Sequence, residues 1–224
     1  MTIRRDLEYL EKQGHIVKIR GGAKSINHLT HYKEDAYQKR ADENVETKAI
    51  IAKKTFELCN KKEMIKKEAI YFDSGTTVMN VITQLNVQNI FAVTSGLNIA
   101  LELCRNKCGR VVLLGGNINH DNLATSGTSA TEQIEKINIG TAFIAASGFS
   151  LNTGFTVGHF YESELKRAVI SRAACVILVM DTTKIGNILP YTFAHLDEVD
   201  YFITEADLPD DIVAKATESG VVVI

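Results

Sequence analysis

Short apolar runs alternate with segments of helical spacing from residue 69 to residue 224. Residues 176–180 (VILVM) are apolar at every position, which indicates a strand buried on both faces. Strands that alternate with helices join into a mostly parallel sheet with helices on both faces. We therefore predict an α/β fold whose strands are residues 69–73, 90–94, 110–114, 139–146, 175–181, 201–204 and 221–224.

The loop after the first predicted strand, residues 73–77 (DSGTT), precedes a predicted helix. A strand that stops at Asp73 and a helix that starts near Thr76 leave several backbone N–H groups aimed at one small volume. Gly75 allows close approach of a ligand, and the hydroxyls of Ser74, Thr76 and Thr77 add donors. The helix dipole favours an anion there, so we predict a phosphate site. The alternative is an ordinary turn with Thr76 as the helix N-cap.

Four later loops have a similar composition. Each combines glycine or hydroxyl side chains with little bulk and directly follows a predicted strand, at residues 94–98, 115–117, 147–149 and 181–184. Loops at the carboxyl ends of parallel strands converge, and ligands bind where they do. We expect the five loops to form one binding rim.

Composition narrows the class of protein. The chain is 45% hydrophobic and 23% charged, and no apolar run approaches the roughly 18 residues of a membrane span. The N-terminus lacks a signal-peptide core, so we expect a cytoplasmic chain with no membrane partner. The four cysteines are dispersed without a CxxC pair, which favours reduced thiols. We expect neither a metal site nor a cofactor.

Charge divides the chain unevenly. Residues 1–26 hold six Lys/Arg against three acidic residues, a net charge of +3, whereas the rest holds 19 against 24, a net charge of −5. Within the basic end, residues 2–13 have the pattern of an amphipathic helix, and residues 16–26 that of a two-stranded hairpin with glycines at its turn. A basic end on an acidic body indicates an anionic partner for that end, although a solvated helix face would carry the same charges.

The N-terminal motif carries a resemblance. Residues 2–7 (TIRRDL), then Leu10, Gly14 and residues 20–23 (RGGA), closely resemble the end of the DNA-binding domain of DeoR-type bacterial transcriptional regulators. The resemblance implies that residues 1–26 are the recognition helix and wing of a truncated winged helix-turn-helix domain. It implies DNA contacts by Thr2, Arg4, Arg5 and Arg20.

The family places further helices before this one. A single helix and a hairpin bury too little apolar surface to hold a fixed shape. We therefore expect residues 1–224 alone to bind operator DNA poorly or not at all.

The remaining motifs resemble the effector-sensing domain of the same regulators, which shares its fold with sugar-phosphate isomerases and CoA transferases. They are DSGTT, VTSGLNIA, LLGG, ESELKRA and DTTKIG, within residues 46–224, and residues 27–45 are expected to be a linker. The resemblance implies that residues 73–77 hold the phosphate of a sugar phosphate or related metabolite and that Lys184 supplies positive charge. The residues implied to frame the ligand are Thr94, Ser95, Gly115, Gly116, Ser147 and Gly148.

Glu164 and Lys166 lie on the helix that faces this region in the family pattern. They are either site residues or an ordinary pair of charges on the helix surface.

The resulting hypothesis is a transcriptional regulator, a repressor, whose effector domain controls DNA binding by a homo-oligomer with paired DNA-binding heads. One alternative is a sugar-phosphate isomerase-like enzyme, for which Asp73 is the nearest general base, with Glu164 behind it. Another is a body that serves only for oligomerisation. We expect no catalytic residues.

Overall fold

The computed structural model describes residues 6–7, 9, 16–19, 22–25, 37–65 and 68–224. The chain divides into two compact units, Met1–Lys33 and Glu34–Ile224. In the first unit Asp6, Leu7 and Tyr9 are helical, and β1 (Ile16–Ile19) pairs antiparallel with β2 (Gly22–Ser25). The helix and hairpin predicted at this end are thus both present in the described residues.

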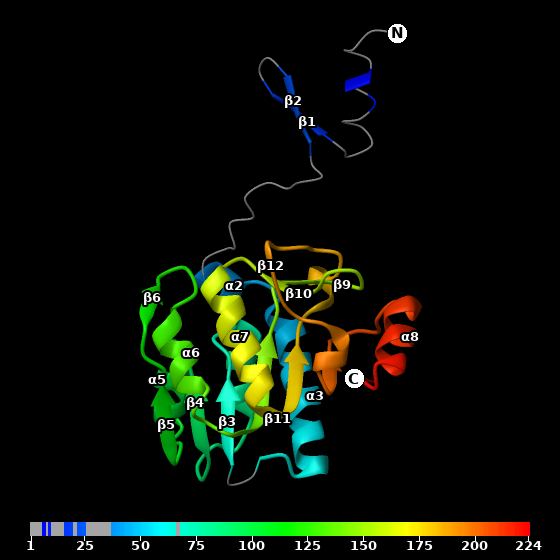
Figure 1. Ribbon diagram of the computed structural model, residues 1–224. Helices are drawn as coiled ribbons and strands as arrows, with labels where there is room; N and C mark the ends of the chain where they lie inside the picture. The colour runs from blue at the N-terminus through cyan, green and yellow to red at the C-terminus, as the bar shows by residue number, and fades with distance from the viewer. Residues whose placement is uncertain (1–5, 8, 10–15, 20–21, 26–36, 66–67) are drawn as a thin grey trace. The chain divides into compact units, whose positions relative to one another are not determined.

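The second unit is built on a seven-stranded sheet (Figure 1). All of its neighbouring strands pair in parallel, as the alternation of strands and helices predicts. In spatial order the strands are β14 (Val222–Val223), β13 (Tyr201–Ile203), β11 (Ala173–Val179), β8 (Ile139–Ala145), β3 (Ala69–Phe72), β4 (Phe91–Thr94) and β5 (Arg110–Leu113).

The order of the strands reverses at the centre of this sheet. The chain runs outward from β3 through β4 to β5, and then returns to β8, which pairs with the other side of β3. Loops after β3 and β8 therefore leave the sheet in opposite directions. Such a switch point opens a crevice at the carboxyl ends of the two strands, which is where open α/β sheets bind ligands.

Helices cover both faces of the sheet because successive strand residues point to opposite sides. One core joins Ile70 and Phe72 to α3, α4 and α5, and the other joins Tyr71 to α6, α7 and α8. The bounds are α3 (Val45–Lys62), α4 (Thr76–Gln84), α5 (Leu97–Arg105), α6 (Thr128–Ile134), α7 (Phe160–Arg172) and α8 (Asp210–Glu218). The predicted α/β class with helices on both faces is confirmed.

Several segments without a predicted helix or strand contain regular structure. Short α2 (Tyr37–Asp42) begins this unit's helices, before α3. The remaining elements are a hairpin of β6 (Asn117–Asn119) and β7 (Ala124–Ser126), a small sheet of β9 (Gly148–Ser150), β10 (Gly154–Val157) and β12 (Tyr191–Ala194), and the 3₁₀ turns Thr182–Lys184 and Leu196–Glu198. Strands of three or four partly polar residues give too short a pattern to be detected in the sequence.

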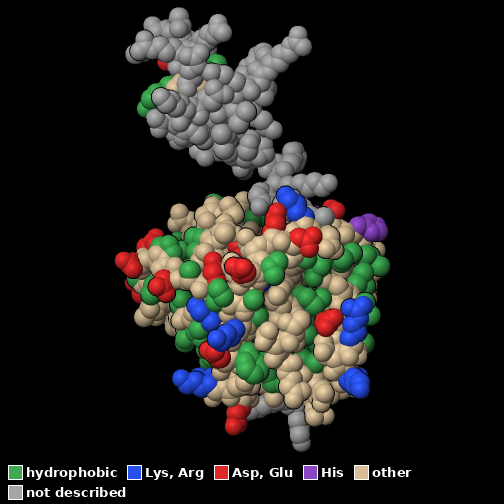
Figure 2. Space-filling model, turned by 180° about the vertical axis from the view of Figure 1, so that it is seen from behind, with side chains coloured by type: hydrophobic (Ala, Val, Ile, Leu, Met, Phe, Trp, Pro, Cys, Tyr) green, Lys and Arg blue, Asp and Glu red, His purple; other side chains and the backbone are tan. Residues whose placement is uncertain are grey.

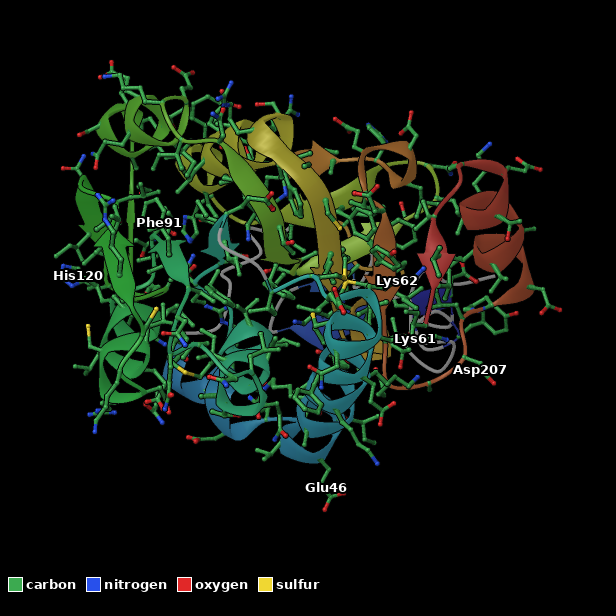
Figure 3. All side chains as sticks on the ribbon, turned by 90° about the horizontal axis from the view of Figure 1, so that it is seen from below. Glu46, Lys61, Lys62, Phe91, His120 and Asp207 are labelled. Carbon is green, nitrogen blue, oxygen red and sulfur yellow. The ribbon has the colours of Figure 1, made fainter. Side chains whose placement is uncertain are left out.

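The surface of the sheet-containing unit mixes charges of both signs. On the face shown in Figure 2, acidic and basic side chains are interspersed. Lys61 and Lys62 lie in the last turn of α3 (Figure 3). None of the helices described is long and apolar enough to span a membrane.

Candidate functional site

The loop after β3 and the residues after β8 meet at the switch point. Residues 73–77 and 145–147 line one pocket there, together with the side chains of Arg40, Lys166 and Lys184. We call it the anion pocket. It combines the predicted loop with three positively charged side chains that come from distant parts of the chain.

The N-terminus of α4 forms the wall of the anion pocket. Gly75 is the N-cap of α4. An added Cβ there would lie 2.6 Å from the Cβ of Ala145, so only glycine lets the loop after β3 pack against the end of β8. The first amides of α4 have no acceptor within the helix. Thr77 is 1% exposed, yet its Oγ1 has no hydrogen-bond partner among the described residues. A buried, unsatisfied hydroxyl next to a helix N-terminus fits an anion as the missing partner.

Asp73 and Lys166 form a buried ion pair beneath this wall. Each side chain is 3% exposed. Lys166 donates to Asp73 Oδ2 and to the carbonyl of Ala145 at 2.9 Å, and the Ala145 N–H donates to the same Asp73 oxygen at 3.0 Å. Since Asp73 and Ala145 follow β3 and β8, the ion pair ties the two sides of the switch point together.

A chain of polar contacts continues from this ion pair to α2. Lys166 lies 3.4 Å from Glu162 Oε1, and Glu162 Oε2 accepts a hydrogen bond of 2.8 Å from the side-chain amide of Asn122. The Asn122 carbonyl oxygen in turn accepts from the guanidinium of Arg40 at 3.1 Å. The pocket therefore brings together three elements that are far apart in sequence, namely α2, the β6–β7 hairpin and α7.

Lys184 brings a second set of charges. Its Nζ lies 3.3 Å from Asp181 Oδ2, and Asp181 also accepts a hydrogen bond from Thr183. Burial raises the pKa of Asp181, but Lys184, the Thr183 hydrogen bond and Lys48 outweigh it, so the pKa is lowered. Lys48 is buried and donates to the backbone carbonyls of Arg40 and Glu43. Burial, and then the charge of Lys184, lower the pKa of Lys48.

A second pocket adjoins the anion pocket and shares Asp73, Ser74, Asn122, Glu162 and Lys166 with it. We call it the polar pocket. Its remaining lining is mostly hydroxyl, amide and imidazole groups, which include Tyr71, Ser95, Asn119, Thr125, Ser126 and His159. Together the two pockets offer cations and helix amides at one end and groups suited to sugar hydroxyls at the other.

The predicted site residues divide into two groups. Those that line the pockets are Asp73, Ser74, Gly75, Thr76, Thr77, Ser95, Ser147 and Lys184. As far as the described residues form the two pockets, Thr94, Gly115, Gly116 and Gly148 do not line them.

Packing explains why the second group is glycine-rich. An added Cβ would lie 2.5 Å from the Ser126 carbonyl oxygen at Gly116 and 2.4 Å from that of Asn187 at Gly148. Thr94 is fully buried, and its hydroxyl accepts from the N–H of Gly96 at 3.0 Å. These residues allow the loops to pack closely but do not face the pockets. The predicted DNA contacts, Thr2, Arg4, Arg5 and Arg20, lie outside the described residues.

Several pocket residues were not predicted. Arg40 lies in the presumed linker, Asn122 in a presumed loop, and Glu162 and His159 at the start of α7. Of the charge pair left open in the sequence, Lys166 is buried and bound to Asp73, while Glu162, one turn earlier, is its pocket partner rather than Glu164. Glu162 and Lys166 are four residues apart in a helix, a spacing that could have drawn attention to them.

Two family models match this chain, one at each end. The DeoR C terminal sensor domain matches residues 43–206, and the DeoR-like helix-turn-helix domain matches residues 1–28. The HTH-type transcriptional regulator GlpR of Haloferax volcanii is 31% identical over 224 residues, which are 100% of this chain and 85% of that protein. The HTH-type transcriptional repressor GlcR of Bacillus subtilis is 30% identical over 91% of this chain and 76% of that protein.

Solved structures show the same fold at low sequence identity. The δ subunit of eIF2B from Chaetomium thermophilum superposes with a TM-score of 0.52 at 13% identity, over 75% of this chain and 58% of that chain. The likeness extends to the fold alone. With both family matches in place, the first covering most of the sheet-containing unit, this chain belongs to the DeoR family of transcriptional regulators.

Proposed function

We propose that residues 46–224 sense a phosphorylated sugar or related metabolite, with α2 contributing to the site, and that residues 1–26 contact operator DNA. The phosphate occupies the anion pocket and the hydroxylated carbon chain extends into the polar pocket. The observation that carries this proposal is the buried Thr77 hydroxyl, without a partner among the described residues, at the N-terminus of a helix. The same pocket receives Arg40, Lys166 and Lys184.

The charges in the pocket support a phosphate rather than a neutral ligand. Lys166 lies beside both Asp73 and Glu162, and Lys184 lies beside Asp181, so these carboxylates do not repel an incoming anion as isolated charges would. The dipole of α4 and the guanidinium of Arg40 add positive potential. This balance fits a phosphate ester better than a neutral ligand.

The proposed output is a change in DNA binding. GlcR, one of the relatives, is named as a repressor, and we propose the same role here. A ligand can act only if it prefers one arrangement of the protein to another. Helix-turn-helix domains read symmetric operators in pairs, so the proposed regulator is a homo-oligomer of at least two copies, in the cytoplasm.

We propose binding without catalysis. An isomerase needs a carboxylate or histidine free to take a proton from a sugar carbon. Asp73, the base that the enzyme alternative names first, instead uses Oδ2 to accept from both Lys166 and the Ala145 amide. Incubation with a panel of sugar phosphates should give no new species by NMR, and turnover of any of them would establish the enzyme alternative.

A thermal-shift screen of sugar phosphates tests the binding site. A ligand at about 100 times its Kd should add about 2.7 kcal/mol to the free energy of unfolding. Lys184→Ala removes a cation from the pocket and should weaken the best ligand roughly 10- to 100-fold, as expected for a charged hydrogen bond of about 1.5–3 kcal/mol.

Lys61→Ala is the matched control, because Lys61 is an exposed lysine outside both pockets (Figure 3). It should leave the affinity unchanged. Equal affinities of the Lys184 and Lys61 variants would place the phosphate elsewhere.

A further inference from the structure

Asn122 joins two helices, α2 and α7, through its side-chain amide. It lies in the turn of the β6–β7 hairpin and is 4% exposed. Its oxygen accepts from Arg40 of α2, and its amide nitrogen donates to Glu162 of α7. An amide has both a donor and an acceptor, so one buried side chain serves both neighbours. Asn122 also lines both pockets.

The hairpin turn is also the support on which α2 rests. The backbone N–H of Tyr37, the first residue of α2, donates to the carbonyl of Asp121 at 2.6 Å. The side chain of Tyr37 is buried. Two successive hairpin residues, Asp121 and Asn122, thus hold the beginning and the middle of α2.

The position of α2 in the chain gives these contacts their significance. It is the first helix of the sheet-containing unit, and the polypeptide that precedes it leads to the N-terminal unit. Figure 1 shows α2 at the end of the sheet where the arrowheads of β3 and β11 point, the end that carries both pockets. A contact that fixes α2 therefore fixes the place from which the chain continues toward the DNA-binding residues.

We propose that Asn122 is a positioning residue that couples occupancy of the pockets to the docking of α2. The proposal rests on the proposed function, since it concerns the same ligand site. When α2 undocks, Arg40 leaves Asn122 and the anion pocket loses a cation, so ligand affinity falls. By reciprocity, a bound ligand must oppose undocking of α2. The ligand thereby raises the population in which α2 is docked, and this change in population is the signal passed to the rest of the chain.

Hydrogen exchange of the backbone amides of α2 measures this coupling, with inorganic phosphate as the probe. If undocking abolishes binding, exchange through undocking slows by about the factor 1 + [L]/Kd, roughly 11-fold at ten times Kd. We expect slowing of this size for Tyr37–Asp42 in the wild-type chain. Amides of α8, which contributes no residue to either pocket, provide the reference.

Two variants separate coupling from binding, each compared at ten times its own Kd for phosphate. Asn122→Ala removes both contacts and releases Arg40 from its place at the pocket, so phosphate should slow the exchange of α2 much less than in the wild type. Asn122→Asp keeps the shape and the acceptor for Arg40 but loses the donor to Glu162, so it should keep the phosphate-dependent slowing and assign the coupling to the Arg40 contact. Asn106→Ala, which removes an exposed amide bonded to Glu102, should behave as wild type.

The outcomes distinguish the two proposals. Phosphate binding by the wild type without slowing of α2 overturns the coupling and leaves the proposed function intact. Equal slowing in wild type and in both Asn122 variants shows that α2 is coupled by another route and overturns the role of Asn122. Failure of the wild type to bind phosphate overturns both the anion pocket and the coupling.

Discussion

The anion pocket has two parts of different origin. Its backbone wall is a single run, residues 73–77, fixed by one strand end and one helix start. Its cations come from α2, α7 and the turn after β11, and Arg40 of α2 lies more than a hundred residues before the other two in the chain. The wall is set by local geometry, whereas the cations are set by the whole fold. On the proposed function, the wall recognises phosphate in general and the side chains decide how the protein responds.

The largest effect on stability is expected for Lys166→Met, which removes one of the cations that the whole fold brings to the pocket. Asp73 would remain buried without its cation, and loss of one partner of a buried pair costs about 3–5 kcal/mol. Urea unfolding measures the loss. The double variant Asp73→Asn, Lys166→Met should recover much of it, and a loss below about 1 kcal/mol in the single variant would mean that the pair is dispensable.

Gly116→Ala tests whether the glycines outside the pockets serve packing alone. At φ 145° the new Cβ would lie 2.5 Å from the Ser126 carbonyl oxygen, so we expect a loss of stability of about 1–3 kcal/mol with unchanged phosphate affinity. Gly115→Ala is the control, because its nearest neighbour, at 3.2 Å, is the end of the Gln133 side chain, which can move. A selective loss of phosphate affinity in the Gly116 variant would return that residue to the ligand site.

Thr77→Val tests the wall itself. Its hydroxyl has no partner among the described residues, so removal should leave the free energy of unfolding unchanged or slightly higher. Phosphate affinity should fall about tenfold, the lower limit for a hydrogen bond to a charged group. Thr83→Val, at an exposed hydroxyl that donates to Asn80 in the same helix, should change neither affinity nor ligand choice. Full affinity in the Thr77 variant would contradict the anion site at α4.

The smallest effect is a pH dependence from Asp181. Because its pKa is lower in the folded protein than the ordinary value of 3.8, the ionised group stabilises the fold above that value. This contribution is lost as pH falls through the lowered pKa. The difference in unfolding free energy between wild type and Asp181→Asn should therefore shrink on acidification below 3.8. A difference independent of pH would show that Lys184 and Lys48 do not act on this carboxylate.

The same division between local and non-local explains what the sequence could predict. The strand at 176–180 and the loop at 73–77 are encoded by adjacent residues, so their nature and approximate limits are visible in the sequence. Asn122 and Arg40 become site residues only because β8 returns beside β3 and the hairpin packs on α2. No periodicity in either segment indicates that contact.

Glycine illustrates the opposite error. Gly75, Gly116 and Gly148 look equivalent in the sequence, each in a short loop after a strand or at its end. Of the three, only Gly75 lines the anion pocket. At the other two a backbone carbonyl oxygen lies too close to leave room for a side chain. The sequence shows that a glycine is present, but only the tertiary fold decides whether a ligand or a protein atom lies where a side chain would be.

The junction of β3 and β8 also has a mechanical consequence. It joins two halves of the sheet, one from residues 69–113 and the other from residues 139–223, and the polypeptide between them includes exposed Leu123. A metabolite bound at the end of this junction, as proposed, would touch both halves at once and hold them together. If a protease cut the chain at Leu123, the two fragments would separate more slowly with the metabolite bound than without it.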